Sequence, residues 1–372
     1  MKKGLALFLL CSDILFVPAL AIAEAPEPSA ASAILIHAES GSVLLEKNAD
    51  EPRLIASTTK LMTALVAAEN SDLSAEVEIR PEWTGVEGSS FYLKSGERYT
   101  LRELLEGLLL SSGNDAALAV SGAVAGSTEK FVSQMNSRAR ELGLANTHFS
   151  NPHGLNAEDH FSSARDLAEI MAAVWKIPSL REILGESSAL VHGRVIENHN
   201  KLLGSCPGVD GGKTGYTKAA GRCLVSTCER DGLRLICVTL SDPEDWADHA
   251  ALYDWAYSRY EAWHFPGESP VPEIPLLAEP GAFVRPVSER ITLCLEAGDC
   301  PAIVWKLPPF LIAAQTGDFA GEALVCLQGK TLCRVSLTWE RREACVCKNI
   351  SPSAVSAPAG RPRSGSEPAG SP

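Results

Sequence analysis

The sequence predicts an α+β fold followed by a small all-β domain. Short apolar segments typical of strands lie on both sides of a long stretch with helical periodicity. A sheet assembled from both ends of such a segment, with the intervening helices on its faces, is an α+β layout. Farther along, at 283–339, short apolar stretches alternate with glycine turns and predict strands alone. With 372 residues, the chain is long enough for one large domain and one smaller one.

The elements of the large domain follow from local patterns. A turn at 39–41 joins two predicted strands, and Asp231-Gly232 is typical of the tight turn of a hairpin. The last predicted helix carries Trp246, Trp255 and Tyr257, which we interpret as core aromatic residues. Strands are predicted at 33–37, 42–46, 222–228 and 233–240, and helices at 57–68, 101–110, 115–124, 128–142, 164–174 and 245–260.

The N-terminus has the pattern of an export signal. Lys2 and Lys3 precede an apolar stretch, and Ala21-Ile22-Ala23 offers a small-x-small cleavage site. Polar residues and a proline interrupt the apolar stretch, which argues against an uncleaved membrane-spanning anchor. We therefore expect residues 1–23 to be removed and the protein to act outside the cytoplasm, in the periplasm or at the outer face of the membrane and cell wall.

Composition shifts mark the predicted domain boundaries. A proline-rich linker follows the large domain, and a C-terminal segment rich in Ser, Pro, Gly and Ala is expected to be disordered. That segment lacks the apolar stripe of an amphipathic helix, so we predict no C-terminal membrane anchor. The expected parts are a signal peptide at 1–23, a loose segment at 24–32, the large domain at 33–262, the linker at 263–280, a small β-rich domain at 281–348 with strands at 291–295, 323–327 and 335–339, and a tail at 349–372.

Charge and cysteine content exclude several kinds of partner. The formal net charge of −13 argues against a nucleic-acid partner, because such proteins bind phosphates through basic surfaces. The 11 cysteines include no C-x-x-C pair and no spacing with histidine that is typical of metal ligands. We therefore predict no metal and no cofactor, and the sequence leaves the pairing of the cysteines open.

Three short motifs carry the functional prediction. They are Ser57-Thr58-Thr59-Lys60, Ser112-Gly113-Asn114 and Lys213-Thr214-Gly215, the last at the expected start of a strand. S-x-x-K alone is weak, because chance produces it roughly once or twice in a chain of this length, and a second copy spans Ser127 to Lys130. K-T-G, with a chance expectation of roughly 0.1, occurs once. Only the copy at Ser57 precedes S-G-N, so order and rarity together make the set specific.

With these motifs, the chain resembles the serine-type D-alanyl-D-alanine carboxypeptidases, the low-molecular-mass penicillin-binding proteins that trim peptidoglycan stem peptides. The resemblance runs from about Ala33 to about Tyr257 and is weaker as far as about Ala344. It implies a β-lactamase/transpeptidase-like large domain, removal of the last residue of stem peptides that end in D-Ala-D-Ala, and inhibition by β-lactams. The matching stretches are 55–64, 88–90, 111–116, 151–155, 163–168 and 208–217.

The residue types suit a serine acyl-transfer site with lysine as the base. Ser57 and Lys60 are three residues apart, so they share one face of a helix. A neutral Lys60 amine can take the proton of the Ser57 hydroxyl, and burial together with the charge of Lys213 favours the neutral amine. The plain alternative for the pair is a helix N-cap and a solvent-facing lysine, and the other two motifs argue against it.

The second motif supplies a hydroxyl and an amide. Ser112 is the candidate proton shuttle between Lys60 and the departing amine, and Asn114 is the candidate amide that holds the peptide backbone of the substrate. A turn at a helix end needs the same residue types, and the two interpretations are compatible. The resemblance implies that the backbone N–H groups of Ser57 and Tyr216 stabilise the oxyanion.

The third motif is expected to meet the terminal carboxylate of the substrate. Lys213 provides a charge and Thr214 a hydroxyl, and Gly215 leaves the strand edge open for pairing with the substrate backbone. In many proteins of the resembling family, an arginine after this hairpin helps to hold the carboxylate. The corresponding stretch at 241–246 contains no arginine, so a second carboxylate anchor stays unassigned.

Other functions share part of this pattern. A class A β-lactamase would show Ser-Asp-Asn where this chain has Gly113, and would carry a Glu-x-x-x-Asn loop that the chain lacks. An endopeptidase that cuts D-alanyl cross-links would use the same chemistry, and that alternative stays open. The chain could also be a non-catalytic penicillin- or wall-binding protein, although intact Ser57, Lys60, Ser112 and Lys213 argue against it.

Overall fold

The structure, a computed structural model, describes residues 24–266 and 270–343. The predicted signal peptide at 1–23 and the predicted tail at 349–372 lie outside the described residues. The chain divides into two compact units. Among the described residues, 24–266 with 290–299 form the first unit, and 270–289 with 300–343 form the second.

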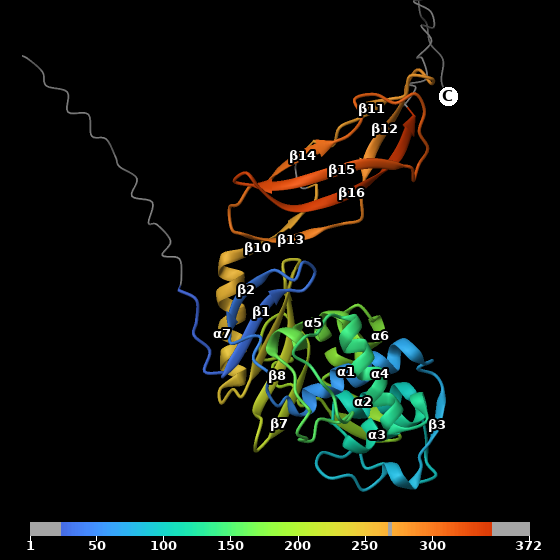
Figure 1. Cartoon of the computed structure of the whole chain (residues 1–372), viewed down its shortest axis with the longest axis vertical. Helices are drawn as coiled ribbons and strands as arrows, with labels where there is room; N and C mark the ends of the chain where they lie inside the picture. Colours follow the sequence, from blue (N-terminus) through green and yellow to red (C-terminus); the bar gives the residue numbers. More distant parts are fainter. Residues whose placement is uncertain (1–23, 267–269, 344–372) are drawn as a thin grey trace, which may run out of the picture. The chain divides into compact units, whose positions relative to one another are not determined.

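The first unit is organised around a five-stranded antiparallel sheet in the order β2-β1-β9-β8-β7 (Figure 1). The N-terminal strand β1 pairs with β9, with Ser32 opposite Leu240 and His37 opposite Leu235. The predicted sheet built from both ends of the domain is therefore confirmed, and β7 forms one of its edges. The strands are β1 (Ser32–His37), β2 (Val43–Lys47), β7 (Val209–Thr217), β8 (Gly221–Arg230) and β9 (Leu233–Leu240).

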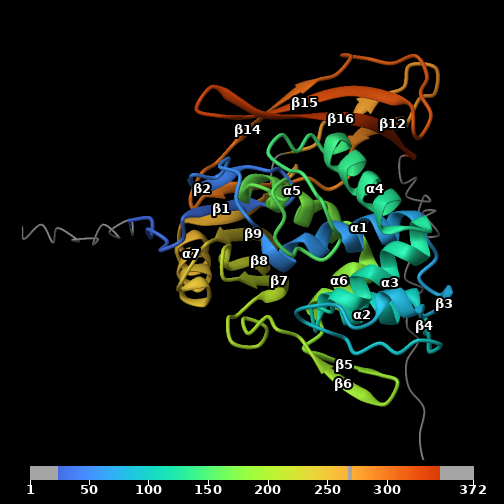
Figure 2. The same cartoon turned by 60° about the horizontal axis from the view of Figure 1, so that its bottom comes forward.

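Helices cover both faces of this sheet, because successive residues of a strand point to opposite sides. In β1, Ile34 and Ile36 belong to the core on the side of α5 (Ala164–Trp175), whereas Leu35 belongs to the core on the side of α7 (Asp245–Arg259). Figure 2 shows α5 and α7 on opposite sides of the sheet. The sheet is thus a buried layer between the helical part of the unit and α7.

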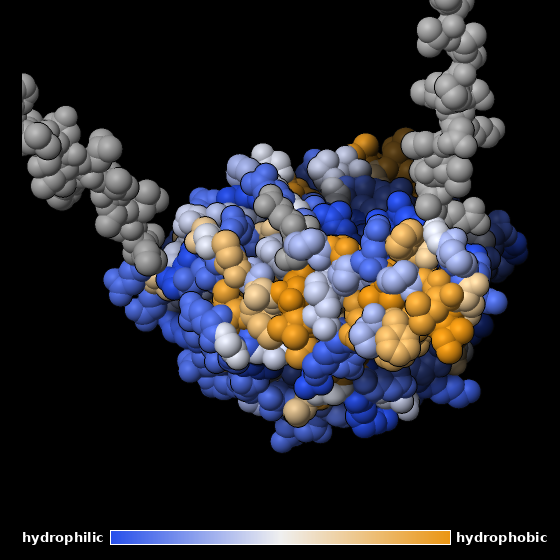
Figure 3. Space-filling model, turned by 90° about the horizontal axis from the view of Figure 1, so that it is seen from above, coloured by the Kyte–Doolittle hydropathy of each residue, from blue (hydrophilic) through white to orange (hydrophobic). Residues whose placement is uncertain are grey.

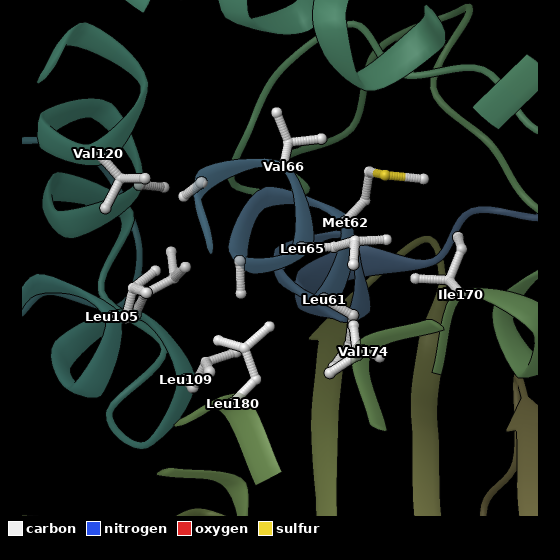
Figure 4. Packing of buried hydrophobic residues seen from close by; sticks show 14 of the residues in the cluster. Leu61, Met62, Leu65, Val66, Leu105, Leu109, Val120, Ile170, Val174 and Leu180 are labelled. Carbon is white, nitrogen blue, oxygen red and sulfur yellow. The ribbon is translucent and has the colours of Figure 1, made fainter. Parts of the chain in front are cut away.

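Helix α1 (Lys60–Asn70) lies at the centre of the helical part. Leu61 and Leu65 are fully buried, and Figure 4 shows them among apolar side chains of neighbouring helices, including Leu109 and Val174. A central helix of this kind holds its first residue, Lys60, in a fixed place. The helices that contact α1 are α2 (Leu101–Leu109), α3 (Asn114–Ala125), α4 (Thr128–Glu141), α5 and α6 (Pro178–Gly185).

Most predicted helices are confirmed to within one residue at each end. The exception is the helix predicted at 57–68, which begins as a 3₁₀ turn, η1 (Ala56–Thr59), before α1. The sequence analysis did not predict several short elements, because contacts with other segments of the chain, rather than local sequence patterns, define them. These are β3 (Glu76–Glu78), η2 (Pro81–Trp83), β4 (Arg98–Thr100), α6, β5 (Ser188–Val191) and β6 (Arg194–Glu197).

The start of β7 was predicted wrongly. The sequence placed Lys213 at the start of a strand, but β7 already begins at Val209. Gly211 and Gly212 have low strand propensity, so the local pattern hid the first half of the strand. Pairing with β8, where Gly212 lies opposite Ser226, imposes the extended conformation instead. Lys213 therefore sits in mid-strand.

The second unit contains a five-stranded antiparallel sheet in the order β11-β12-β16-β15-β14. Its buried face includes Val325, Val335 and Leu337, which alternate with more exposed neighbours. The strands are β11 (Ile274–Pro275), β12 (Ala282–Val287), β14 (Ala302–Lys306), β15 (Phe319–Leu327) and β16 (Lys330–Glu343).

One predicted strand of the small domain belongs to the first unit. β13 (Thr292–Glu296) pairs with β10 (Tyr260–His264), which directly follows α7. The predicted linker at 263–280 therefore contains the end of β10 and all of β11. Apolar alternation identifies a strand but not its partner, so the sequence could not assign β13 to a sheet.

The surface view in Figure 3 shows a broad apolar area on one face. Exposed apolar patches of this kind often mark sites of interaction.

Among the described residues, no helix combines the length and the apolar character that a membrane crossing requires. The large exposed apolar side chains of the second unit include Leu277, Val304, Phe310, Ile312, Phe319 and Leu332.

The packing around α1 leads to a stability prediction. Leu65→Ala removes a fully buried side chain, so we expect the free energy of unfolding to fall by about 2–5 kcal/mol. Leu190→Ala is the matched control, because Leu190 is 73% exposed on β5 and its loss should change stability by less than about 0.5 kcal/mol. Urea unfolding measures both variants, and equal losses would contradict the central position of α1.

Candidate active site

Ser57 lies in the short turn η1 directly before α1. Ala56, the residue before it, has a left-handed backbone with φ of 47°. The loop at 151–155 lies close to this turn, because a Cβ on Gly154 would come 2.0 Å from the Ala56 carbonyl oxygen. The turn therefore presents a half-buried Ser57 hydroxyl beside the first residue of α1.

The Lys60 amine is held by three oxygen atoms. Its Nζ lies 3.0 Å from Ser57 Oγ, 2.7 Å from Asn114 Oδ1 and 2.8 Å from the His153 carbonyl oxygen. The side chain is fully buried. Two of the three motifs thus meet at one nitrogen atom.

Burial also sets the protonation of Lys60. Desolvation is the largest cause that holds the pKa of the amine well below its usual 10.5, and the positive charge of Lys213 lowers it further. The negative charge of Asp115 acts in the opposite direction. Because desolvation and the Lys213 charge dominate, the environment favours a neutral Lys60 amine that can accept a proton.

Asn114 and Ser112 differ in what they contact. Asn114 is the first residue of α3, and its Nδ2 donates 2.6 Å to the Glu87 carbonyl oxygen while its Oδ1 accepts from Lys60. Both ends of this amide therefore contact the protein, and its role in holding the substrate stays a prediction. Ser112 has a left-handed backbone with φ of 59°, and its buried Oγ has no hydrogen-bond partner among the described residues.

Lys213 is deeply buried, and its predicted contact with the substrate carboxylate stays a prediction. Lys213 is 1% exposed, and its Nζ donates 3.0 Å to the carbonyl oxygen of the next residue, Thr214. Burial lowers the pKa of Lys213 to about 7. Lys213 acts on Lys60 through its charge, while Thr214 is the residue of the pair that reaches the cleft surface.

Gly215 allows β7 to approach the turn that carries Ser57. A Cβ at this position would come 2.9 Å from the Ile55 carbonyl oxygen and 3.1 Å from the Ser57 backbone nitrogen. A larger residue would therefore push the strand edge away from Ser57. The close approach places the Ser57 amide beside the strand that continues into Tyr216.

These residues surround a cleft of about 550 Å³. Ser57 and Ser112 contribute hydroxyl groups to its wall. A second cavity of the same volume, beside Trp83, contains none of the three motifs, so the chemistry of the lining rather than size identifies the site. The lining residues are Ser57, Ser89, Ser112, His199, Thr214, Gly215, Tyr216, Arg222, Asp245 and Trp246.

The sequence analysis gave no site role to five of the lining residues, one of which, Ser89, lies in a stretch that matches the resembling family. Trp246 was interpreted only as a core residue, but it lines the cleft in addition to packing beside the core under α7. Arg222 lies opposite Tyr216 in the pairing of β7 with β8, which the sequence analysis did not predict. His199 and Asp245 carried no usable pattern, since only the folded chain brings them to the cleft.

Comparison with known proteins identifies related sequences. The sequence profile of the D-alanyl-D-alanine carboxypeptidase family (Peptidase_S11) matches residues 20–244. The D-alanyl-D-alanine carboxypeptidase DacF of Bacillus subtilis (strain 168) is 38% identical over 245 residues, which cover 62% of this chain and 63% of that protein. DacC of Escherichia coli (strain K12) is 38% identical over 254 residues, 64% of each protein. The chain thus spans slightly less than two thirds of the length of these two relatives.

Solved structures share the fold. Penicillin binding protein 5 from Haemophilus influenzae matches with a TM-score of 0.71 and 26% identity, over 85% of this chain and 98% of that chain. The D-alanyl-D-alanine carboxypeptidase from Mycobacterium tuberculosis H37Rv matches with a TM-score of 0.61 and 34% identity, over 64% and 95%. The first unit thus has the penicillin-binding protein fold expected from the sequence. Because the family profile covers more than half of the chain, the protein belongs to the D-alanyl-D-alanine carboxypeptidase family, peptidase family S11.

Proposed function

We propose that this protein is a serine-type D-Ala-D-Ala carboxypeptidase that acts on peptidoglycan stem peptides. The observation that supports this most directly is the 3.0 Å contact between a deeply buried Lys60 amine and the Ser57 hydroxyl at the wall of a cleft. In this proposal the enzyme is exported and meets its substrate in the periplasm or at the outer face of the cytoplasmic membrane. It needs no metal or cofactor, because a neutral amine provides the base.

The first half of the reaction forms an acyl-enzyme. Lys60 takes the proton of the Ser57 hydroxyl, and Ser57 Oγ attacks the carbonyl carbon of the bond between the two D-alanines. The backbone N–H groups of Ser57 and Tyr216 stabilise the oxyanion. The C–N bond then breaks, and the departing D-alanine amine receives the proton from Lys60 through Ser112, whose hydroxyl has no competing hydrogen-bond partner among the described residues.

The second half releases the shortened peptide. A water molecule gives its proton to Lys60 and attacks the ester carbonyl carbon, and the proton returns to Ser57 Oγ as the C–O bond breaks. A β-lactam would acylate Ser57 in the same way. Its leaving group stays attached to the acyl group, so it hinders the attack of water and the acyl-enzyme persists.

The nucleophile can be tested with penicillin and intact mass spectrometry. We expect the native chain to gain the mass of one penicillin and Ser57→Ala to gain none. Ser127→Ala is the matched control, because Ser127 begins the second S-x-x-K copy but caps helix α4, so this variant should still react. An adduct on Ser57→Ala would show that the nucleophile is wrong. An adduct without release of D-alanine from a D-Ala-D-Ala peptide would favour the non-catalytic binding protein.

The base can be tested through the pH dependence of acylation. The reactive form of Lys60 is neutral, so the rate should rise with pH through the pKa of Lys60, with the inflection well below 10.5. Lys60→Arg keeps the charge and stays protonated, so we expect acylation to slow by about 10²–10⁴-fold. Lys130→Arg, in the second S-x-x-K copy, should leave both the rate and the profile unchanged. A normal rate in Lys60→Arg would exclude Lys60 as the base.

A further inference from the structure

The cleft has one strongly basic side chain on its surface. Among the described residues that line it, Arg222 alone is a lysine or arginine, and the buried Lys213 does not belong to the lining. His199 also lines the cleft, but its environment disfavours the charged ring. Burial is the largest cause that lowers the pKa of His199, and the charges of Lys213 and Lys60 lower it further. An arginine keeps its charge at every pH at which the protein is folded. The guanidinium of Arg222 is therefore the positive charge that a ligand carboxylate would contact in this cleft.

The sheet register directs Arg222 toward the ligand edge of β7. Arg222 lies directly opposite Tyr216, and Leu224 lies opposite Thr214. Because the side chains of opposed residues share a face, Thr214 and Arg222 are diagonal neighbours on the side of the sheet that faces α7. Lys213 points to the other side, toward α1. β7 is an edge strand, so a ligand beside it is accessible from both faces.

The first residues of α7 hold the guanidinium in place. Asp245 Oδ1 accepts from Arg222 Nη2 at 2.5 Å and from the Trp246 backbone N–H at 2.9 Å. The guanidinium carbon lies 5.4 Å from the centroid of the Trp246 ring. Arg222 Nε is buried and has no hydrogen-bond partner among the described residues, so the donors open to a ligand are those of the two terminal nitrogens. Asp245 thus orients the guanidinium through one nitrogen and leaves donors for a second acceptor.

The exposure of this ion pair is asymmetric. The Asp245 side chain is 4% exposed and the Arg222 side chain is 40% exposed, so the cation of the pair is far more accessible from the cleft than the anion. Arg230, on the same strand, provides a contrast. It pairs with Asp254 and stacks on Tyr257, and its Nε donates to the Pro207 carbonyl oxygen, all away from the cleft. The guanidinium of Arg230 is thus bound by other parts of the protein, whereas part of the Arg222 guanidinium is open to the cleft.

We propose that Arg222 binds the terminal carboxylate of the substrate and is the second carboxylate anchor that the sequence left unassigned. This inference rests on the proposed function. It states that the enzyme selects peptides with a free C-terminal carboxylate through a guanidinium on the α7 side of β7, with Thr214 as the adjacent hydroxyl. Arginine suits this task because its planar donors match the two oxygens of a carboxylate.

The test compares ligands that differ only in this carboxylate. One pair is a peptide ending in D-Ala-D-Ala and the same peptide ending in D-alaninamide, and the other is benzylpenicillin and its methyl ester. For Arg222→Gln we expect the preference for the free acid to fall about 10- to 100-fold, in kcat/KM for the peptides and in the acylation rate constant for the penicillins. The reactions of the amide and the ester should change little. Arg222→Lys should restore part of the preference.

Arg230→Gln is the matched control, because it removes an arginine from the same strand without changing the cleft. It should keep the native preference, and thermal melts should show that both variants are folded. If Arg222→Gln slows free-acid and blocked ligands equally, or leaves the preference unchanged, Arg222 is a structural residue and the inference is wrong. A native chain that reacts with penicillin but releases no D-alanine would instead overturn the proposed function, and the penicillin pair would still decide the role of Arg222.

Discussion

The site depends on a lysine amine that is buried beside a serine hydroxyl. Lys60 can act as a base only when it is neutral, and the fold favours this state by removing the amine from water and placing Lys213 near it. This arrangement costs stability, because the unfolded chain binds a proton at neutral pH that the folded chain tends to release. Each unit by which the pKa of a group is lowered corresponds to about 1.4 kcal/mol, and the resulting loss of stability diminishes as pH rises toward the pKa of the unfolded chain.

The rest of the first unit compensates for that cost and fixes the geometry. α1 is surrounded by five helices, so its first residue cannot move without disturbing the core. Two residues of the site, Ala56 and Ser112, have left-handed backbones that cost on the order of 1 kcal/mol each. Such strain persists only where the surrounding packing enforces it. The close approach of Gly154 and Gly215 to the turn that carries Ser57 shows where the neighbouring segments enforce it.

The sheet separates two kinds of positive charge. Lys213 lies on the face toward α1, buried and close enough to influence Lys60, whereas Arg222 lies on the face toward α7 and reaches the cleft. In the proposed assignment, the first charge keeps the base neutral and the second recognises the substrate. Burial lowers the pKa of Lys213 to about 7, so its charge acts on Lys60 most fully below that pH. A permanently charged guanidinium held by Asp245 suits the recognition of the substrate.

The sequence alone determined the fold class and most helix boundaries, and it singled out motifs whose residues line one cleft. Those features depend on local periodicity and on residue types at fixed spacing, as in Ser57 and Lys60, which are three residues apart. It could not assign β13 to a sheet, place Lys213 in mid-strand, or show that Asn114 is bound at both ends by the protein. It also could not bring Arg222, Asp245 and His199 to one cleft. Those features depend on which distant segments pair and pack, because strand register, burial and the ends of helices are decided by contacts between residues far apart in the chain.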